Sequence, residues 1–192
     1  MSAPWRAEAR SRPLSGVGLI LPNPEPRTPD RESVSGRALE LRLHTATPEE
    51  TEALGRRLGG LLRAGDVIAL SGDLGAGKTV LARGIAAGAG AAGHVASPTF
   101  TFLREYHGPV TIYHADLYRL DRPQQLEDLG LDEILDGNGI VVLEWAEKAR
   151  PLLPPEHLWI TIRFMNGEDT RELAFSPKGA RYVEIIEKLT KA

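Results

Sequence analysis

The run GDLGAGKT, residues 72–79, decides how this chain folds. It follows a short apolar segment, Asp66 to Ser71, that is typical of a buried strand, and it opens an Ala-rich stretch that is typical of a helix. Glycines let a backbone wrap closely enough for several N–H groups to face one anion, and a following helix adds its positive N-terminal end. The run therefore predicts a phosphate-binding loop between a strand and a helix.

The last two residues of this loop predict what it binds. In the pattern G-x-x-x-x-G-K-[ST], Lys78 would span the β- and γ-phosphates of a nucleoside triphosphate, and the Thr79 hydroxyl would ligate Mg²⁺. A chance glycine-rich turn is the alternative, but the flanking strand and helix favour a P-loop. The guanine-reading run N-K-x-D is absent, so we expect ATP and disfavour a GTP-dependent switch. The residues expected to bind nucleotide here are Gly72, Asp73, Leu74, Gly75, Ala76, Gly77, Lys78 and Thr79.

A magnesium site of this class needs a second anchor, usually an acid at the end of a neighbouring apolar strand. Two acids compete for this role: Glu144 ends the run IVVLE, and Asp116 ends the less hydrophobic run IYHAD. Glu144 fits better, because its strand is the more continuously apolar of the two. Strand-end carboxylates are often only turn or cap residues, so the sequence leaves the direct ligand open.

One further segment could contribute to the site. The run SPTFTF follows the expected P-loop helix, and Ser97 or Thr99 could offer a hydroxyl to the γ-phosphate or to a water molecule, although an ordinary loop entering a strand is the simpler interpretation. Trp145 and Trp159 are interpreted as core or packing residues.

The fold class predicted is α/β, a single domain with a mixed, mostly parallel central sheet and helices on both faces. Leu39, Leu41 and Leu43 alternate with polar residues, as in a half-buried strand. A helix is expected with Thr47 as N-cap, Glu50 as capping-box partner, and an end at Gly65. The connection MNGEDT between two late strands predicts an antiparallel hairpin, and a last helix follows it. The other expected strands span residues 66–71, 100–106, 110–115, 140–143, 158–164 and 171–175.

The domain organisation follows from length and composition. The chain of 192 residues is long enough for one ordinary domain, which we place at residues 38–192. Residues 1–37 carry six of the 14 prolines without apolar periodicity and are predicted to be a disordered extension. No apolar run approaches the ~20 residues of a membrane helix, and with no cysteine present the cytoplasm is the simplest location. Between His114 and Glu147 there are nine acidic and two basic residues, which disfavours direct binding of nucleic acid there.

Four motifs taken together, GDLGAGKT, SPTF, HADLYRL (His114 to Leu120) and LEW (Leu143 to Trp145), resemble the TsaE family of bacterial ATPases. The resemblance covers the chain from about Leu39 to the C-terminus, and four motifs in the same order make it far more specific than the P-loop alone. The proline-rich extension departs from the family pattern.

The resemblance implies a role in making threonylcarbamoyladenosine in tRNAs that read codons beginning with A. Family members bind the TsaB and TsaD proteins, and their ATP hydrolysis supports repeated turnover of that complex, so tRNA would be contacted only indirectly. The resemblance further implies that Lys78 binds phosphate, Thr79 and Glu144 hold magnesium, and Asp116 supports hydrolysis. It also implies that the SPTF loop acts as a switch, that Tyr118 and Arg119 lie at the partner-facing active site, and that Arg171 helps to enclose the nucleotide. A P-loop small-molecule kinase is the alternative function, but it would need an Arg-bearing lid that the sequence does not show.

Overall fold

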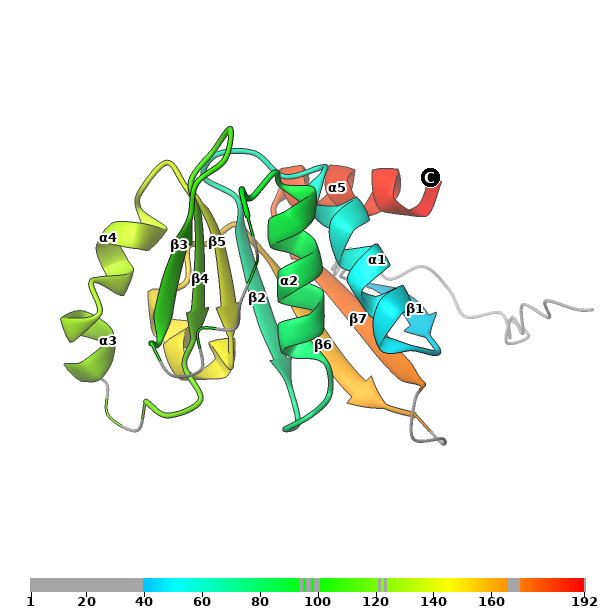
Figure 1. The fold of residues 1–192 in the computed structure, drawn as a ribbon, viewed down its shortest axis with the longest axis horizontal. Coiled ribbons are helices and arrows are strands. Elements are labelled where there is room, and N and C mark those ends of the chain that lie inside the picture. Colours follow the sequence, from blue (N-terminus) through cyan, green and yellow to red (C-terminus); the bar gives the residue numbers. More distant parts are fainter. Residues whose placement is uncertain are drawn as a thin grey trace, which may run out of the picture. The chain divides into compact units, whose positions relative to one another are not determined.

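The parallel strands at the centre of the sheet determine the architecture (Figure 1). The computed structural model describes residues 40–93, 95, 98, 101–120, 122, 124–165 and 170–191. They form a seven-stranded sheet with the strand order β1-β7-β6-β2-β5-β4-β3. The predicted extension 1–37 and the expected strand start at Leu39 lie outside the described residues. The strands are β1 Leu41–Thr45, β2 Val67–Gly72, β3 Leu103–Tyr106, β4 Ile112–Asp116, β5 Ile140–Glu144, β6 His157–Phe164 and β7 Arg171–Lys178.

The sheet is mixed, as predicted, with its parallel pairings in the middle. Strand β2 pairs in parallel with β5 on one side and β6 on the other, and β4 pairs in parallel with β5. The outer strands β3, β7 and β1 are antiparallel to their neighbours, and the β6–β7 pairing confirms the expected hairpin. Because parallel strands end at the same edge, the carboxyl ends of β2, β5 and β4 lie together at the lower end of the molecule in Figure 1.

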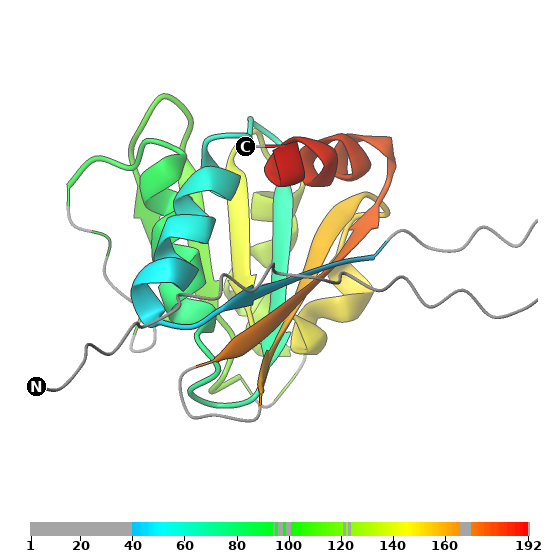
Figure 2. The ribbon, with the colours of Figure 1, turned by 90° about the vertical axis from the view of Figure 1, so that its right-hand side faces the viewer.

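Helices cover both faces of the sheet, which confirms the α/β layering. Helices α1 Pro48–Gly59, α2 Lys78–Gly88 and α5 Ala180–Lys191 share one core with the sheet. Helices α3 Gln124–Asp128 and α4 Leu131–Leu135, which the sequence did not predict, cover the other face with the 3₁₀ helix η1 Ala146–Leu152 (Figure 2). Successive residues of β2 alternate between these two cores, so this strand is buried on both sides. None of the helices built from the described residues is long and apolar enough to cross a membrane.

Helix α1 begins as predicted and ends earlier than predicted. The Thr47 hydroxyl accepts from the Glu50 N–H at 3.2 Å, and the Glu50 carboxylate accepts from the Ala46 N–H at 2.6 Å. The expected end at Gly65 is wrong, because the helix stops at Gly59 and the next residues turn through i→i−3 hydrogen bonds. Two successive glycines, Gly59 and Gly60, favour this early end, since glycine has a low helix propensity.

Glycines hold α1 and α2 in direct backbone contact. A Cβ atom added at Gly59 would lie 2.1 Å from the Ile85 carbonyl oxygen, and one added at Gly84 would lie 2.2 Å from the Glu52 carbonyl oxygen. No side chain fits in either place, so only glycine lets the helices approach this closely. The contact matters for the site, because α2 is the helix that the P-loop runs into.

The opposite end of β2 is anchored by α5. Arg181 donates to the buried Asp66 carboxylate at 2.9 Å, and this hydrogen bond raises the pKa of the guanidinium. The Tyr182 hydroxyl accepts from the Val67 N–H at 2.7 Å, and burial raises the pKa of Tyr182 to about 12. The start of the central strand is therefore fixed by α5.

We predict that Gly59→Ala destabilises the domain, because the new methyl group would collide with the Ile85 carbonyl. Overpacking of this kind costs on the order of 1–3 kcal/mol. Gly60→Ala is the matched control, since its Cβ would have no neighbour closer than 3.6 Å and its backbone is already helical at φ −65°. Urea unfolding followed by circular dichroism measures the free energy of unfolding of both variants. Equal values for the two variants would contradict the conclusion that only glycine at position 59 lets α1 and α2 approach this closely.

Candidate functional site

The loop between β2 and α2 has the backbone that the sequence predicts. Gly72, Gly75 and Gly77 have φ values of 136°, 78° and 109°, which residues with side chains rarely adopt. Gly72 is also confined by packing, because an added Cβ would lie 2.2 Å from the Ile162 carbonyl oxygen. The loop ends where α2 begins at Lys78, so the first N–H groups of that helix have no partner within it and can receive an anion.

Lys78 is held beneath the loop. Its ammonium donates to the carbonyl oxygens of Gly72 at 2.6 Å and Asp73 at 2.8 Å, and the side chain is almost fully buried. The same nitrogen lies 3.7 Å from the centre of the Trp145 ring. Burial lowers the pKa of Lys78, while the carboxylate of Glu144 acts in the opposite direction. A cation fixed in this way is ready to exchange two weak acceptors for phosphate oxygens.

Thr79 and Glu144 meet directly below the loop. The Thr79 hydroxyl donates to Glu144 Oε2 at 2.7 Å, although the two residues are 65 positions apart. Asp116, the competing acid, lies opposite Glu144 in the parallel β4–β5 register, and its Oδ1 accepts from the Tyr118 N–H at 3.0 Å. The structure therefore places both acids at one edge, with Glu144 in contact with the P-loop threonine.

A pocket of about 280 Å³ opens between the P-loop and the ends of β4 and β5. Predicted phosphate-binding, metal-binding and partner-facing residues all line it, among them Asp116, Tyr118 and Arg119 of the HADLYRL run. The lining residues are Leu74, Gly75, Gly77, Lys78, Thr79, Val80, Asp116, Tyr118, Arg119, Glu144 and Trp145. Four charged side chains, those of Lys78, Asp116, Arg119 and Glu144, thus converge on one space, as expected of a site for a charged ligand.

Trp145 is more than the packing residue that the sequence suggested. It packs partly against the second core, but its backbone is left-handed at φ 57° and ψ 42°, which turns the ring back towards Lys78 as β5 ends. Its ring centre lies 4.9 Å from that of Tyr118. A bulky residue rarely takes this conformation, and such strain is concentrated at functional sites.

Five predicted nucleotide-binding residues are not among those lining this pocket: Gly72, Asp73 and Ala76 of the loop itself, and Arg171 and Thr99. Arg171 lies on the other side of the loop, where its Nε donates to the Ala76 carbonyl oxygen at 3.1 Å and its guanidinium stacks over Phe164. It helps to line a smaller pocket of about 110 Å³ between the P-loop and the start of α1. Thr99, with Ser97, lies outside the described residues.

Two residues that the structure brings to the site, Trp145 and His114, had no predicted role there. His114 Nε2 lies 2.8 Å from Glu144 Oε1, and its side chain is fully buried. One signal was present in the sequence: a histidine inside an otherwise apolar strand needs a buried partner. Which partner it finds depends on the pairing of β4 with β5.

The fold, the glycine-rich loop and the lysine–threonine pair at the start of α2 place the chain in the P-loop nucleoside triphosphatase class. The family model described as "Threonylcarbamoyl adenosine biosynthesis protein TsaE" matches residues 45–173. The chain belongs to the TsaE family, which confirms the resemblance found in the four motifs.

Relatives and a solved structure support this assignment. A Bacillus subtilis protein named tRNA threonylcarbamoyladenosine biosynthesis protein TsaE is 42% identical over 153 residues, covering 79% of this chain and 95% of the relative. The protein of that name from Treponema pallidum is 38% identical over 133 residues, covering 69% of this chain and 98% of the relative. The crystal structure of Bacillus subtilis YdiB matches with a TM-score of 0.69 at 38% identity, over 82% of this chain and 98% of that one.

We predict that nucleotide binding changes the fluorescence of Trp145. A phosphate would draw the Lys78 ammonium away from the indole ring, which it now touches at 3.7 Å. Titration with ADP should change the emission of the wild-type protein and of Trp159→Phe, but not that of Trp145→Phe. A signal that disappears only with Trp159→Phe would contradict this geometry.

Proposed function

We propose that the protein is an ATPase that supports formation of threonylcarbamoyladenosine in tRNA, by Mg²⁺-dependent ATP hydrolysis that drives turnover of a complex of TsaB and TsaD. The single observation that carries the proposal is the contact between Thr79 and Glu144 beside the buried Lys78. Membership of the TsaE family supplies the pathway. A cytoplasmic location is part of this proposal.

The loop backbone and Lys78 would bind the phosphates. The N–H groups at the start of α2 would receive the phosphates, and Lys78 would leave the carbonyls of Gly72 and Asp73 to bind the β- and γ-phosphate oxygens. The buried position of Lys78 favours this exchange, since a desolvated cation gains more from a close anion than an exposed one does.

The oxygen atoms around Thr79 fit a magnesium ion. Thr79 offers a hydroxyl, and Glu144 and Asp116 offer carboxylates, which are the hard ligands that Mg²⁺ prefers. When bound with ATP, Mg²⁺ would neutralise negative charge that develops on the phosphates. We assign Thr79 and Glu144 to the ion. Asp116, on the adjacent strand, would orient the attacking water.

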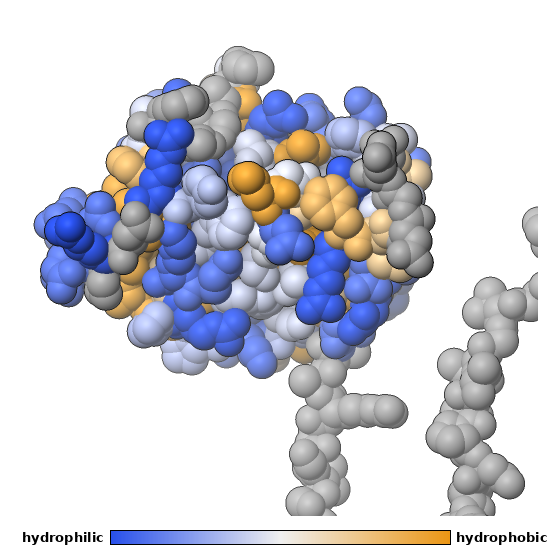
Figure 3. All heavy atoms as spheres, turned by 90° about the horizontal axis from the view of Figure 1, so that it is seen from below, coloured by the Kyte–Doolittle hydropathy of each residue, from blue (hydrophilic) through white to orange (hydrophobic). Residues whose placement is uncertain are grey.

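Exposed apolar side chains beside the site support the proposal that protein partners dock there. Leu74 and Tyr118 line the pocket, Phe164 reaches towards the loop at Gly75, and Met165 follows at the β6–β7 tip. Figure 3 looks onto this end and shows apolar side chains in the middle of a largely hydrophilic surface. Aromatic residues and methionine at such a surface are typical of protein interfaces.

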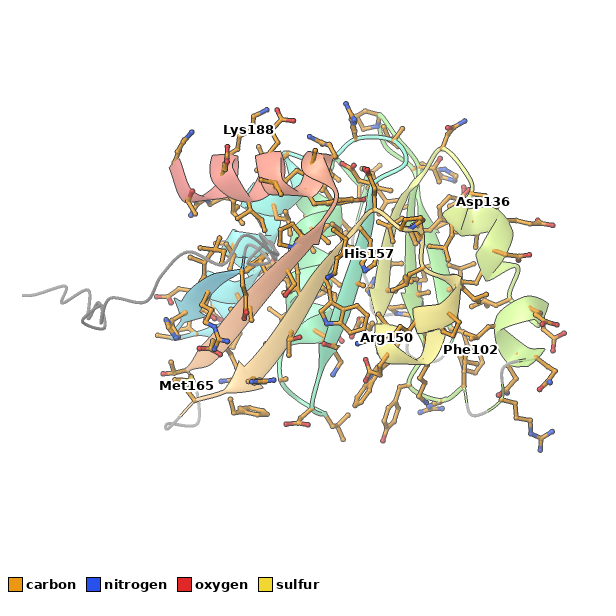
Figure 4. All side chains as sticks on the ribbon, turned by 180° about the vertical axis from the view of Figure 1, so that it is seen from behind. Phe102, Asp136, Arg150, His157, Met165 and Lys188 are labelled. Carbon is orange, nitrogen blue, oxygen red and sulfur yellow. The ribbon has the colours of Figure 1, made fainter. Side chains whose placement is uncertain are left out.

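We predict slow hydrolysis of ATP by the protein alone and a faster rate with TsaB and TsaD. Lys78→Ala should lower the stimulated rate by about 100-fold or more, since it removes the cation that stabilises the transferred phosphoryl group. Lys188→Ala is the matched control, because Lys188 lies on α5 at the far end of the molecule from Met165 (Figure 4).

Release of inorganic phosphate measures the rate, and mass spectrometry of the products tests the kinase alternative. Strong hydrolysis that ignores both partners would contradict the proposal. Transfer of the γ-phosphate from ATP to a metabolite would establish a kinase instead.

We further predict that Met165→Asp weakens stimulation by TsaB and TsaD while leaving ADP affinity unchanged. A charge there would have to be desolvated in an apolar contact. Leu152→Asp is the control: Leu152 is 39% exposed and Met165 is 41% exposed, but Leu152 lies at the end of η1. Equal effects of both substitutions on stimulation would argue against docking at the P-loop end.

A further inference from the structure

His114 is a buried polar residue that the proposed function leaves unexplained. It lies in the middle of β4 with none of its side chain exposed. Burial of an imidazole costs free energy unless its nitrogens are hydrogen-bonded. Within the described part of the chain, Nε2 contacts Glu144 Oε1 at 2.8 Å, whereas Nδ1 is buried and has no hydrogen-bond partner.

The different surroundings of the two ring nitrogens fix the position of the imidazole proton. Glu144 receives a hydrogen bond from Thr79 and, as a carboxylate, can only accept from His114 as well. Nε2 must therefore carry a proton and donate it. A proton on Nδ1 would be an orphaned donor in the core, which is rarer in proteins than an unsatisfied acceptor. The geometry requires the tautomer with the proton on Nε2 alone.

The two oxygen atoms of the Glu144 carboxylate have different hydrogen-bond partners. Oε1 is held from the core side by His114, and Oε2 is held from the loop side by Thr79. His114 reaches Glu144 diagonally across the parallel pair, because its direct register partner is Val142 and the partner of Glu144 is Asp116. Two hydrogen bonds at opposite oxygens fix both the rotamer and the plane of the carboxylate.

We propose that His114 is a positioning residue for Glu144: its Nε2–H holds Oε1 in the core so that Oε2 faces the P-loop threonine and the metal position. The functional part of this inference rests on the proposed role of Glu144. Without the hydrogen bond from His114, the carboxylate would be free to rotate away from Thr79. Mg²⁺ would then lose an oriented ligand, while Lys78 and the loop backbone would still bind phosphate.

The proton position is tested on the nucleotide-free protein, by long-range ¹H–¹⁵N correlation of the histidine rings near neutral pH. The signals of His114 are assigned by their loss in His114→Gln. We expect a protonated Nε2 and a bare Nδ1. A proton on Nδ1, alone or together with one on Nε2, overturns the inference whether or not the protein hydrolyses ATP.

The positioning role is tested with His114→Leu and His114→Gln. The glutamine amide can donate from about the place of Nε2, whereas leucine fills the space without a donor. We expect His114→Leu to raise the Mg²⁺ concentration needed for half-maximal ATP binding by about 10-fold, as for other residues that orient metal ligands. Binding of ADP without Mg²⁺ should be unchanged, and His114→Gln should restore the Mg²⁺ dependence.

Thermal unfolding and Mg²⁺-free ADP binding separate positioning from a purely structural role. If His114 only filled space, His114→Leu would leave the Mg²⁺ dependence of ATP binding unchanged, and this result overturns the proposal. Equal weakening of nucleotide binding by both substitutions, with and without Mg²⁺, also overturns it. If His114→Leu does not fold, His114→Gln and the ¹H–¹⁵N correlation still test the proposal. His114→Gln must then bind ATP with the Mg²⁺ dependence of the wild type, and a different Mg²⁺ dependence overturns the positioning role. Wild-type protein that binds ATP without any effect of Mg²⁺ would refute the proposed function while leaving the proton position as a separate result.

Discussion

The parallel pairing of β2 with β5 is the constraint on which the site depends. Its register places Leu70 opposite Glu144, so the strand that leads into the P-loop and the strand that ends in the acid stop at the same edge. Thr79, at the start of α2, then lies 2.7 Å from the Glu144 carboxylate. A shift of one residue in this register would turn Glu144 to the other face of the sheet and separate it from the loop.

The site concentrates polar groups where the rest of the sheet is apolar. Lys78, His114, Asp116 and Glu144 are all at most 5% exposed. Burial of this kind is tolerated because the groups bind one another or the loop carbonyls, and a cluster that depends on mutual hydrogen bonds holds each member in one orientation. The left-handed backbone of Trp145 adds local strain at the same point. The candidate site is thus the part of the fold where local preferences are overruled.

Most of the fold could be predicted because its signals are local. The buried strand, glycine loop and helix around residues 66–88 follow from adjacent residues, as do the Thr47 cap and the β6–β7 hairpin. The predictions were less accurate where propensity is weak or contacts are distant. Helices α3 and α4 are only five residues each, too short for a periodic pattern, and the end of α1 at Gly59 reflects two glycines that also pack against α2. The pairing of β1 with β7 joins segments about 130 residues apart.

The sequence by itself determined the glycine-rich loop between β2 and α2, the α/β class and the family, because each rests on residue types at fixed spacing along the chain. It left Glu144 and Asp116 as competing acids, since both end apolar strands. Only the tertiary structure decided which of them touches Thr79, that Trp145 lies against Lys78, and that His114 holds the second oxygen of Glu144. These contacts depend on strand order and register, which are set by packing between distant segments.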